Sequence, residues 1–146
     1  MCRNYIKNNG KGKFEVSILP TEAQFSNLNG MVVEDFDQDG NLDVLTIGNT
    51  YGIDVSIGRS DASNGAFLKG LGNGKFEVIS IQQSGWFVEE DAKALGKIQL
   101  VNGKCAFVAT QNRGKLKVFT LNQNVQFVPV GALDEKALLL YKNGKQ

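Results

Sequence analysis

An all-β fold is predicted for this 146-residue chain by its composition and by the repetition of one short unit. The chain contains 17 glycines and nine phenylalanines but only two prolines, a composition typical of short strands joined by tight turns. Residues 5–18, 65–81 and 115–130 share one outline: a strand, a turn rich in Asn and Gly, and a second strand that opens on an aromatic residue. The equivalent aromatic residues are Phe14, Phe76 and Phe127.

Two strand–loop–strand units, at residues 31–47 and 86–110, lie between these hairpins. Over residues 43–47 both alternating sets of side chains are largely apolar, which indicates a strand buried on both faces between neighbouring sheets. The second unit and the end of the chain supply the remaining expected strands, at residues 86–91, 97–100, 105–109 and 137–141.

The strongest functional signal is the loop at residues 35–43, which reads Asp-Phe-Asp-Gln-Asp-Gly-Asn-Leu-Asp. Aspartates stand at positions 1, 3, 5 and 9, with no basic residue among them. Carboxylates this close repel one another unless a cation neutralises them, and hard oxygen donors on a flexible loop suit Ca²⁺. Gly40, at position 6, is expected to supply the positive φ with which the chain wraps the ion. The predicted ligands are the carboxylates of Asp35, Asp37, Asp39 and Asp43 and the main-chain carbonyl of Asn41.

The residues around these aspartates argue against an EF-hand. An EF-hand loop requires a bidentate glutamate at position 12 and a helix on each side. Position 12 is here Thr46, and the flanks at residues 31–33 and 44–47 are apolar and strand-like. The sequence therefore predicts a calcium loop that joins two strands.

Residues 30–49, with an apolar strand, an aspartate-rich loop and a second apolar strand, resemble the FG-GAP/VCBS repeat, the calcium-loop blade of integrin-α-like β-propellers. The Asn/Gly hairpins at residues 9–14 and 72–76 are similar to those of the same family. The resemblance implies consecutive four-stranded antiparallel blades, about two and a half in number, which is too few to close a propeller. The implied divisions are residues 1–20 as the last hairpin of a preceding blade, 31–82 as the calcium-loop blade, 86–130 as a degenerate blade and 131–146 as the start of a further strand unit.

The second strand–loop–strand unit is expected to have lost its calcium site. Asp91 aligns with Asp35, but Lys93 and Leu95 replace the next two aspartates of the pattern. The Lys93 ammonium is expected to take over part of the role of the cation beside Asp91.

The longest connection, residues 49–63, offers a second candidate site. Tyr51, Asp54, Arg59 and Asp61 are polar and aromatic side chains of the kind that bind a sugar or a peptide. The alternative is a structural hairpin, in which Arg59 pairs with one of the two aspartates and Tyr51 packs against the scaffold.

Charge and composition restrict the function. The formal net charge is +1 and the basic residues are scattered, which argues against nucleic acid and anionic membranes as partners. No apolar run approaches the length of a membrane span, about 18 residues. The chain also contains no histidine, the commonest general base, so it is expected not to be an enzyme.

The resemblance implies a non-catalytic, calcium-stabilised segment of a secreted or surface protein that binds a protein or a carbohydrate, as in adhesion. Weak calcium loops fill where calcium is abundant, so an extracellular or cell-surface location is expected, although residues 1–5 carry no signal peptide. Two alternatives stay open: the propeller domain of a polysaccharide-degrading enzyme, and a pure scaffold. Because unclosed blades leave open strand edges, the chain is also expected to form a homo-oligomer or to belong to a longer propeller chain.

Overall fold

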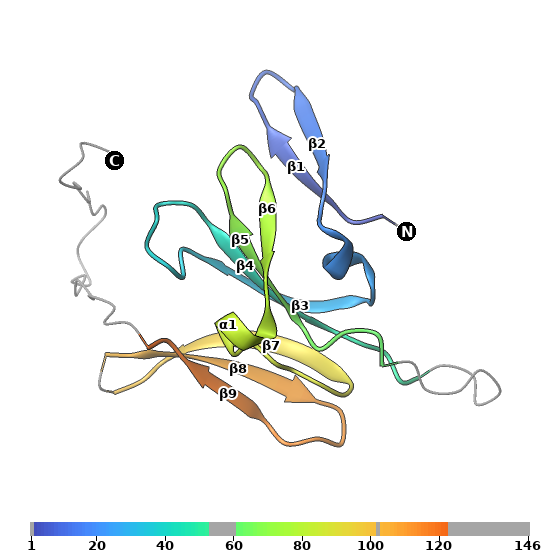
Figure 1. The fold of residues 1–146 in the computed structure, drawn as a ribbon, viewed down its shortest axis with the longest axis vertical. Helices are drawn as coiled ribbons and strands as arrows, with labels where there is room; N and C mark the ends of the chain where they lie inside the picture. The colour runs from blue at the N-terminus through green and yellow to red at the C-terminus, as the bar shows by residue number, and fades with distance from the viewer. Residues whose placement is uncertain (1, 53–60, 102, 123–146) are drawn as a thin grey trace.

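The computed structural model describes residues 2–52, 61–101 and 103–122 (Figure 1). The all-β prediction is confirmed, because the described residues form nine strands in three antiparallel sheets. In the described residues the only helices are η1 (Thr21–Gln24), a 3₁₀ turn, and α1 (Ile81–Ser84), of four residues each. None of these helices is long and apolar enough to cross a membrane.

The first sheet is a hairpin of two strands, β1 (Asn4–Asn8) and β2 (Phe14–Ile18). Its turn is closed by two main-chain hydrogen bonds, from Asn9 N–H to the Lys13 carbonyl (2.9 Å) and from Lys13 N–H to the Gly10 carbonyl (3.0 Å). The hairpin lies within the stretch that the sequence assigned to the end of a preceding blade.

The second sheet is a four-stranded meander whose spatial order follows the chain. Glu34 pairs with Asp43, so the acidic loop is the connection between the first two strands of this sheet. Leu45 and Ile47 on one face and Thr46 on the other are at most 5% exposed, which confirms that this strand is buried on both faces. The strands are β3 (Leu28–Glu34), β4 (Asp43–Gly48), β5 (Ala66–Gly70) and β6 (Phe76–Ile79).

The third sheet consists of β7 (Ala92–Gln99), β8 (Cys105–Gln111) and β9 (Lys117–Thr120). The strand expected at residues 86–91 is wrong, because this segment is irregular and docks on the second sheet through the Trp86 indole. The indole N–H donates to the Thr46 carbonyl at 3.0 Å.

Part of the predicted organisation falls outside the described residues. This applies to residues 123–130 of the third hairpin and to the whole strand unit expected at 131–146. Of the two cysteines, Cys2 is exposed and Cys105 is buried in β8, and both are free thiols.

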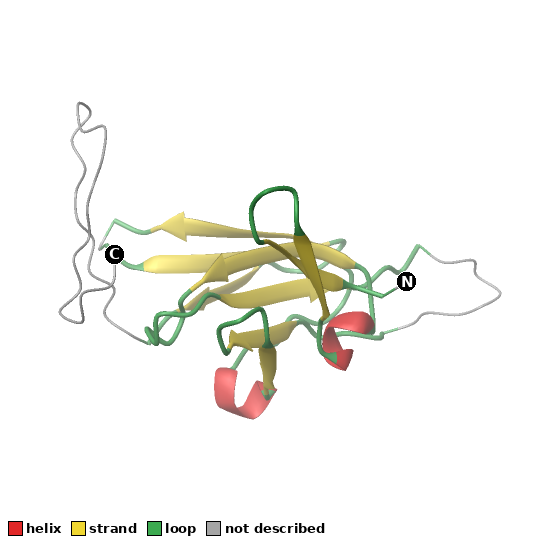
Figure 2. Cartoon of the chain, turned by 90° about the horizontal axis from the view of Figure 1, so that it is seen from above, coloured by secondary structure: helices red, strands yellow, loops and turns green. Residues whose placement is uncertain are grey.

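The three sheets follow one another, with the four-stranded sheet between the β1–β2 hairpin and the third sheet (Figures 1 and 2). Strand β7 packs against β3 and β4, and the larger hydrophobic core lies at this interface. A smaller core of Ala23, Ala66 and Leu68 lies where the first hairpin and η1 meet the second sheet. No sheet formed by the described residues closes on itself. The fully buried side chains of the larger core include Ile47, Val88 and Phe107.

Candidate metal centre

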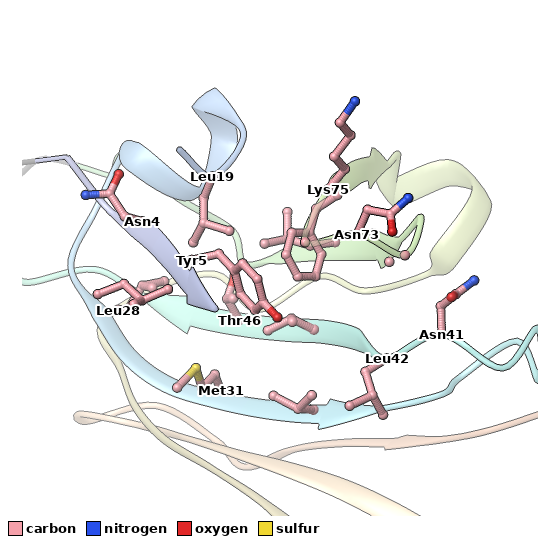
Figure 3. A pocket seen from close by; sticks show the side chains of 18 of the residues that line it. Asn4, Tyr5, Leu19, Leu28, Met31, Asn41, Leu42, Thr46, Asn73 and Lys75 are labelled. Atoms are coloured by element: carbon pink, nitrogen blue, oxygen red, sulfur yellow. The ribbon is translucent and has the colours of Figure 1, made fainter. Parts of the chain in front are cut away.

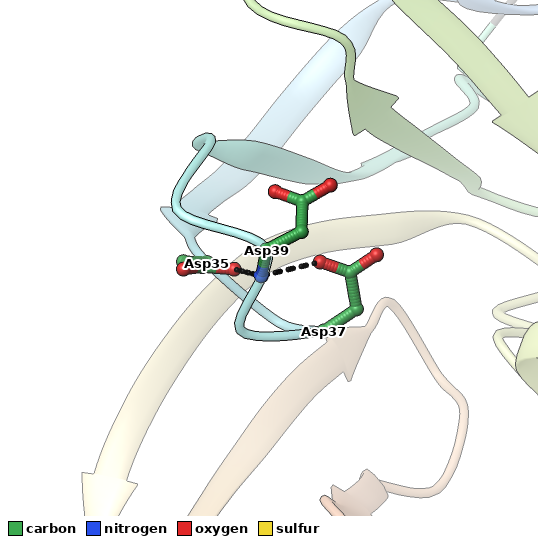
Figure 4. A group of neighbouring side chains, drawn as sticks. All are labelled: Asp35, Asp37 and Asp39. Carbon is green, nitrogen blue, oxygen red and sulfur yellow. Dashed lines mark hydrogen bonds between the residues drawn. The ribbon is translucent and has the colours of Figure 1, made fainter. Parts of the chain in front are cut away.

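The loop between β3 and β4 brings three of the predicted calcium ligands together (Figure 4). Asp35, Asp37 and Asp39 each offer one carboxylate oxygen, and these oxygens lie within 4.8 Å of one another. The side chains of Asp37 and Asp39 are about one-third exposed, at 33% and 31%, so the group opens to solvent.

A buried aromatic residue anchors the loop. Phe36 is 5% exposed and lies edge-on to two other rings, Phe67 of β5 at 5.6 Å and Phe107 of β8 at 5.2 Å. The flanking Asp35 is only partly buried and Asp37 is exposed. The buried ring between these two aspartates thus attaches the loop to the core while their carboxylates stay accessible.

Main-chain N–H groups hold the three carboxylates in place. The Asp35 carboxylate accepts hydrogen bonds from the N–H groups of Asp39 (3.1 Å) and Gly40 (2.9 Å). Asp37 Oδ1 accepts a second bond from Asp39 N–H (3.2 Å), and Asp39 Oδ1 accepts one from Asn41 N–H (2.8 Å). Gly40 has a φ of 88°, which confirms the predicted left-handed residue in this turn.

Lys69 of β5 contributes a cation that the sequence analysis did not anticipate. Its Nζ contacts Asp37 Oδ2 and lies 3.1 Å from Asp39 Oδ2. Its hydrogen bond to Asp37, followed by that to Asp39, raises the pKa of Lys69 above its usual value. The bond from Asn41 N–H, followed by that from Lys69, lowers the pKa of Asp39. The acidic group thus attracts and stabilises a positive charge.

Asp43, the fourth predicted carboxylate ligand, has a different environment. It is fully buried and does not belong to the group of three oxygens. Its Oδ2 accepts from Phe36 N–H (2.9 Å) and its Oδ1 from Gly70 N–H (2.8 Å), so it ties the start of the loop to the end of β5. Burial raises the pKa of Asp43, the two N–H donors oppose this shift, and the charges of Asp37 and Asp39 add to it.

The donor set fits Ca²⁺ chemically. The three side-chain donors that lie together are carboxylate oxygens, and hard oxygen ligands in a flexible loop suit Ca²⁺ better than the softer transition metals. Asp35, Asp37 and Asp39 would hold the ion first. Asn41 and Asp43 lie at the end of the same loop, and each Asp43 oxygen keeps a second lone pair beyond its N–H bond.

The prediction of a second, degenerate loop after Asp91 is wrong. Lys93 and Leu95 lie within strand β7 and not in a loop, because residues 92–99 pair continuously with β8 apart from one irregularity near Lys93. The expected charge pairing is nevertheless present: Lys93 Nζ lies 2.5 Å from Asp91 Oδ1. Burial raises the pKa of Asp91, but Lys93 and the Asn112 amide outweigh burial, and the pKa is lowered overall.

The candidate ligand site on the long connection is only partly within the described residues. Asp54 and Arg59 lie outside them. Tyr51 and Asp61 are brought together, since the tyrosine hydroxyl donates to Asp61 Oδ1 at 2.7 Å. The same oxygen accepts from the Asn49 amide (3.0 Å), so this carboxylate serves to order the connection.

Asn49 is a second residue whose role the sequence did not reveal. It is 1% exposed and has a φ of 98°. Besides Asp61, its amide donates to the carbonyls of Ser63 (2.6 Å) and Glu90 (3.1 Å), and its Oδ1 accepts from Ser63 N–H (3.0 Å). Asparagine tolerates a positive φ better than most residues, so the sequence could have indicated this backbone conformation. The hydrogen bonds to residues distant in sequence leave no signal in the sequence.

Comparison with protein-family models, with curated proteins and with solved structures finds no match to this chain. The FG-GAP/VCBS resemblance therefore rests on the quoted residues alone.

Proposed function

We propose that this chain is a non-catalytic, calcium-binding β-sheet segment of the FG-GAP/VCBS type, in which Ca²⁺ binds the loop between β3 and β4. The observation that carries the proposal is that three aspartate oxygens lie within 4.8 Å of one another in the loop between β3 and β4. The contact of the Lys69 ammonium with two of these aspartates supports it, because it marks the group as a site of strong negative potential.

Bound calcium would supply charge neutralisation and a crosslink within the loop. Asp35, Asp37 and Asp39 would bind the ion, and Asp43 would hold the end of the loop against β5 through Gly70. Lys69 would have to release Asp37 and Asp39, because a cation at these oxygens repels its ammonium group. Calcium binding should therefore be weakened by Lys69.

A non-catalytic role is favoured by how the carboxylates are used. Those of Asp35 and Asp43 accept main-chain hydrogen bonds that order the loop, and those of Asp37 and Asp39 are paired with Lys69. The chain also contains no histidine, the commonest general base. The ion is thus proposed to stabilise a scaffold that presents a binding surface.

Calorimetry on the full chain tests calcium binding. We expect about one Ca²⁺ per chain with a Kd of roughly 10⁻⁴–10⁻³ M or somewhat tighter, and much weaker binding of Mg²⁺. Asp37→Asn should abolish the heat, whereas Glu22→Gln, an exposed acidic residue on η1, should leave it unchanged. Absence of calcium heat in the parent, or equal binding of Mg²⁺, would contradict the proposal.

The proposed partner is a protein or a carbohydrate, met outside the cell or at its surface. This part rests on the resemblance, and a glycan or protein array probed with and without calcium tests it. A calcium-dependent signal supports recognition. Turnover of an acidic polysaccharide that is lost in Tyr51→Phe would instead favour the polysaccharide-degrading enzyme. Silence in both assays would favour a scaffold, whether in a homo-oligomer or in a longer propeller.

A further inference from the structure

The β1–β2 and β5–β6 hairpins are structurally equivalent. In the first turn Asn9 N–H donates to Lys13 and Lys13 N–H to Gly10; in the second, Leu71 N–H donates to Lys75 (2.9 Å) and Lys75 N–H to Gly72 (3.1 Å). The residues that follow the two glycines have the same left-handed backbone, with φ of 53° at Lys11 and 54° at Asn73. Strand β1 therefore corresponds residue by residue to strand β5.

The two strands differ in what lies on their second edge. Strand β5 pairs with β6 on one side and with β4 on the other, and its Gly70 N–H points to β4, where it donates to Asp43. Strand β1 pairs with β2, and no other described strand lies on its second edge.

The hydrogen-bond pattern shows which groups of β1 face this free edge. Bonds from Asn9 N–H to Lys13 and from Leu19 N–H to Arg3 point the main-chain groups of the odd-numbered residues toward β2. Since these directions alternate along a strand, the N–H and C=O groups of Asn4, Ile6 and Asn8 point to the free edge.

An apolar cavity of about 490 Å³ lies beside that edge (Figure 3). Residues 4–6 of β1 line it, but no residue of β2 does. Its other wall consists of Met31 and Val33 of β3, which are 63% and 46% exposed, and of Leu42 just before β4, which is 63% exposed. Tyr5 and Phe76 both line the cavity and pack edge-on, with ring centroids 5.7 Å apart. The hairpin thus contacts β6 through Tyr5, while Met31 and Val33 on β3 stay exposed.

The next interface along the chain shows what fills the equivalent space. Strand β4 pairs with β5, and its Leu45 and Ile47 side chains fill the space between the second and third sheets, where they are at most 5% exposed. A strand that paired with β1 in the same way would point the two corresponding side chains into the cavity, over Met31 and Val33.

We propose that the free edge of β1, with the adjoining cavity, binds an extended polypeptide strand that begins with aspartate and carries large aliphatic residues at alternate positions. Main-chain bonds to Ile6 would give affinity and the cavity would select the side chains, as in other β-strand additions. By equivalence with Gly70, the Asn8 N–H would donate to the leading aspartate. One difference limits the ligand: a Cβ at Gly70 would lie 2.2 Å from the Leu42 carbonyl oxygen, so Asn8 excludes a residue packed like Leu42 before the aspartate.

A peptide that copies residues 43–49, with a free amino terminus and two lysines added at its carboxyl end for solubility, tests the proposal on the full chain. Binding is measured by fluorescence anisotropy in EDTA, so that the result does not depend on the calcium site. We expect saturable binding, with slowed amide exchange at Asn4, Ile6 and Asn8. Ile6→Pro removes an edge donor without touching a bond to β2 and should weaken binding roughly tenfold.

The matched control is Val16→Pro. Val16 pairs directly with Ile6 and is equally exposed, at 60% against 61%, but its N–H points to the opposite edge of the hairpin. It should bind like the parent. Equal loss in both variants, or unchanged amide exchange at saturating peptide, would overturn the proposal.

Modified peptides keep the test valid if a proline variant does not fold. In the protein, Val44 pairs with Leu68, whose main-chain groups face β4, so Val44 N–H points toward β5 and Leu45 N–H points away from it. N-methylation of the peptide at the copy of Val44 should therefore abolish binding to the parent chain, whereas N-methylation at the copy of Leu45 should be tolerated. The opposite preference, or no preference, would overturn the proposed pairing.

Discussion

Replacing Asp43 by alanine should destabilise the fold strongly even without calcium. The Asp43 carboxylate is fully buried and accepts the N–H groups of Phe36 and Gly70 at 2.9 and 2.8 Å. Removing it leaves both donors buried without a partner. These donors belong to different segments, the acidic loop and β5, so the substitution also disconnects the loop from the sheet.

The size of the effect follows from these two bonds. A hydrogen bond to a charged acceptor contributes about 1.5–3 kcal/mol, and a donor left buried and unsatisfied costs about 1–3 kcal/mol. Burial of the charge opposes this contribution, as the raised pKa of Asp43 indicates. We therefore expect Asp43→Ala to lower the free energy of unfolding by about 3 kcal/mol, which is the lower end of the range for the loss of two such hydrogen bonds. Asp43→Asn keeps one acceptor oxygen and should lose about half as much.

Urea unfolding in EDTA, followed by circular dichroism, measures this loss. For a chain of this length, about 3 kcal/mol corresponds to a fall in Tm of roughly 10 °C. Asp39→Ala is the matched control, because Asp39 also accepts a main-chain N–H in the loop but lies at the surface, where water can replace it. A loss below about 1 kcal/mol for Asp43→Ala, or an equal loss in Asp39→Ala, would refute the reasoning.

Three further outcomes are expected. Lys69→Met should tighten calcium binding in calorimetry, because it removes the ammonium group that competes for Asp37 and Asp39. Lys7→Met, at the equivalent place in β1, should leave the calcium affinity unchanged. Equal calcium affinities of Lys69→Met and the parent would exclude competition. The pKa of Asp91 is lowered on folding, so its contribution is present above the ordinary value of 3.8 and is lost as pH falls through the folded value. Urea unfolding between pH 2 and 6 should show a flatter acid dependence in Asp91→Asn, and an unchanged slope would contradict this. Asn49→Ala should cost about 1–3 kcal/mol in the same assay, since it removes a buried amide that links three segments; a neutral effect would contradict that role.

The sequence by itself determined the local structure. The Asn/Gly turns predicted hairpins at residues 5–18 and 65–81, and both are present with equivalent hydrogen bonds. Gly40 predicted a left-handed turn residue, and the apolar alternation over 43–47 predicted a strand buried on both faces. These features depend on backbone preference and on a period of two residues, which neighbouring residues alone define.

Only the tertiary structure decided which distant residues meet. Lys69 reaches the acidic loop because β5 lies beside β4, and Asp43 faces Gly70 for the same reason. The strand predicted at residues 86–91 was wrong because this segment bonds to scattered partners, Trp86 to Thr46 and Val88 N–H to Asn64, and not to a neighbouring strand. No local pattern reveals these partners. Sheet order and register set such contacts, and both depend on the packing of the whole chain rather than on any one segment of it.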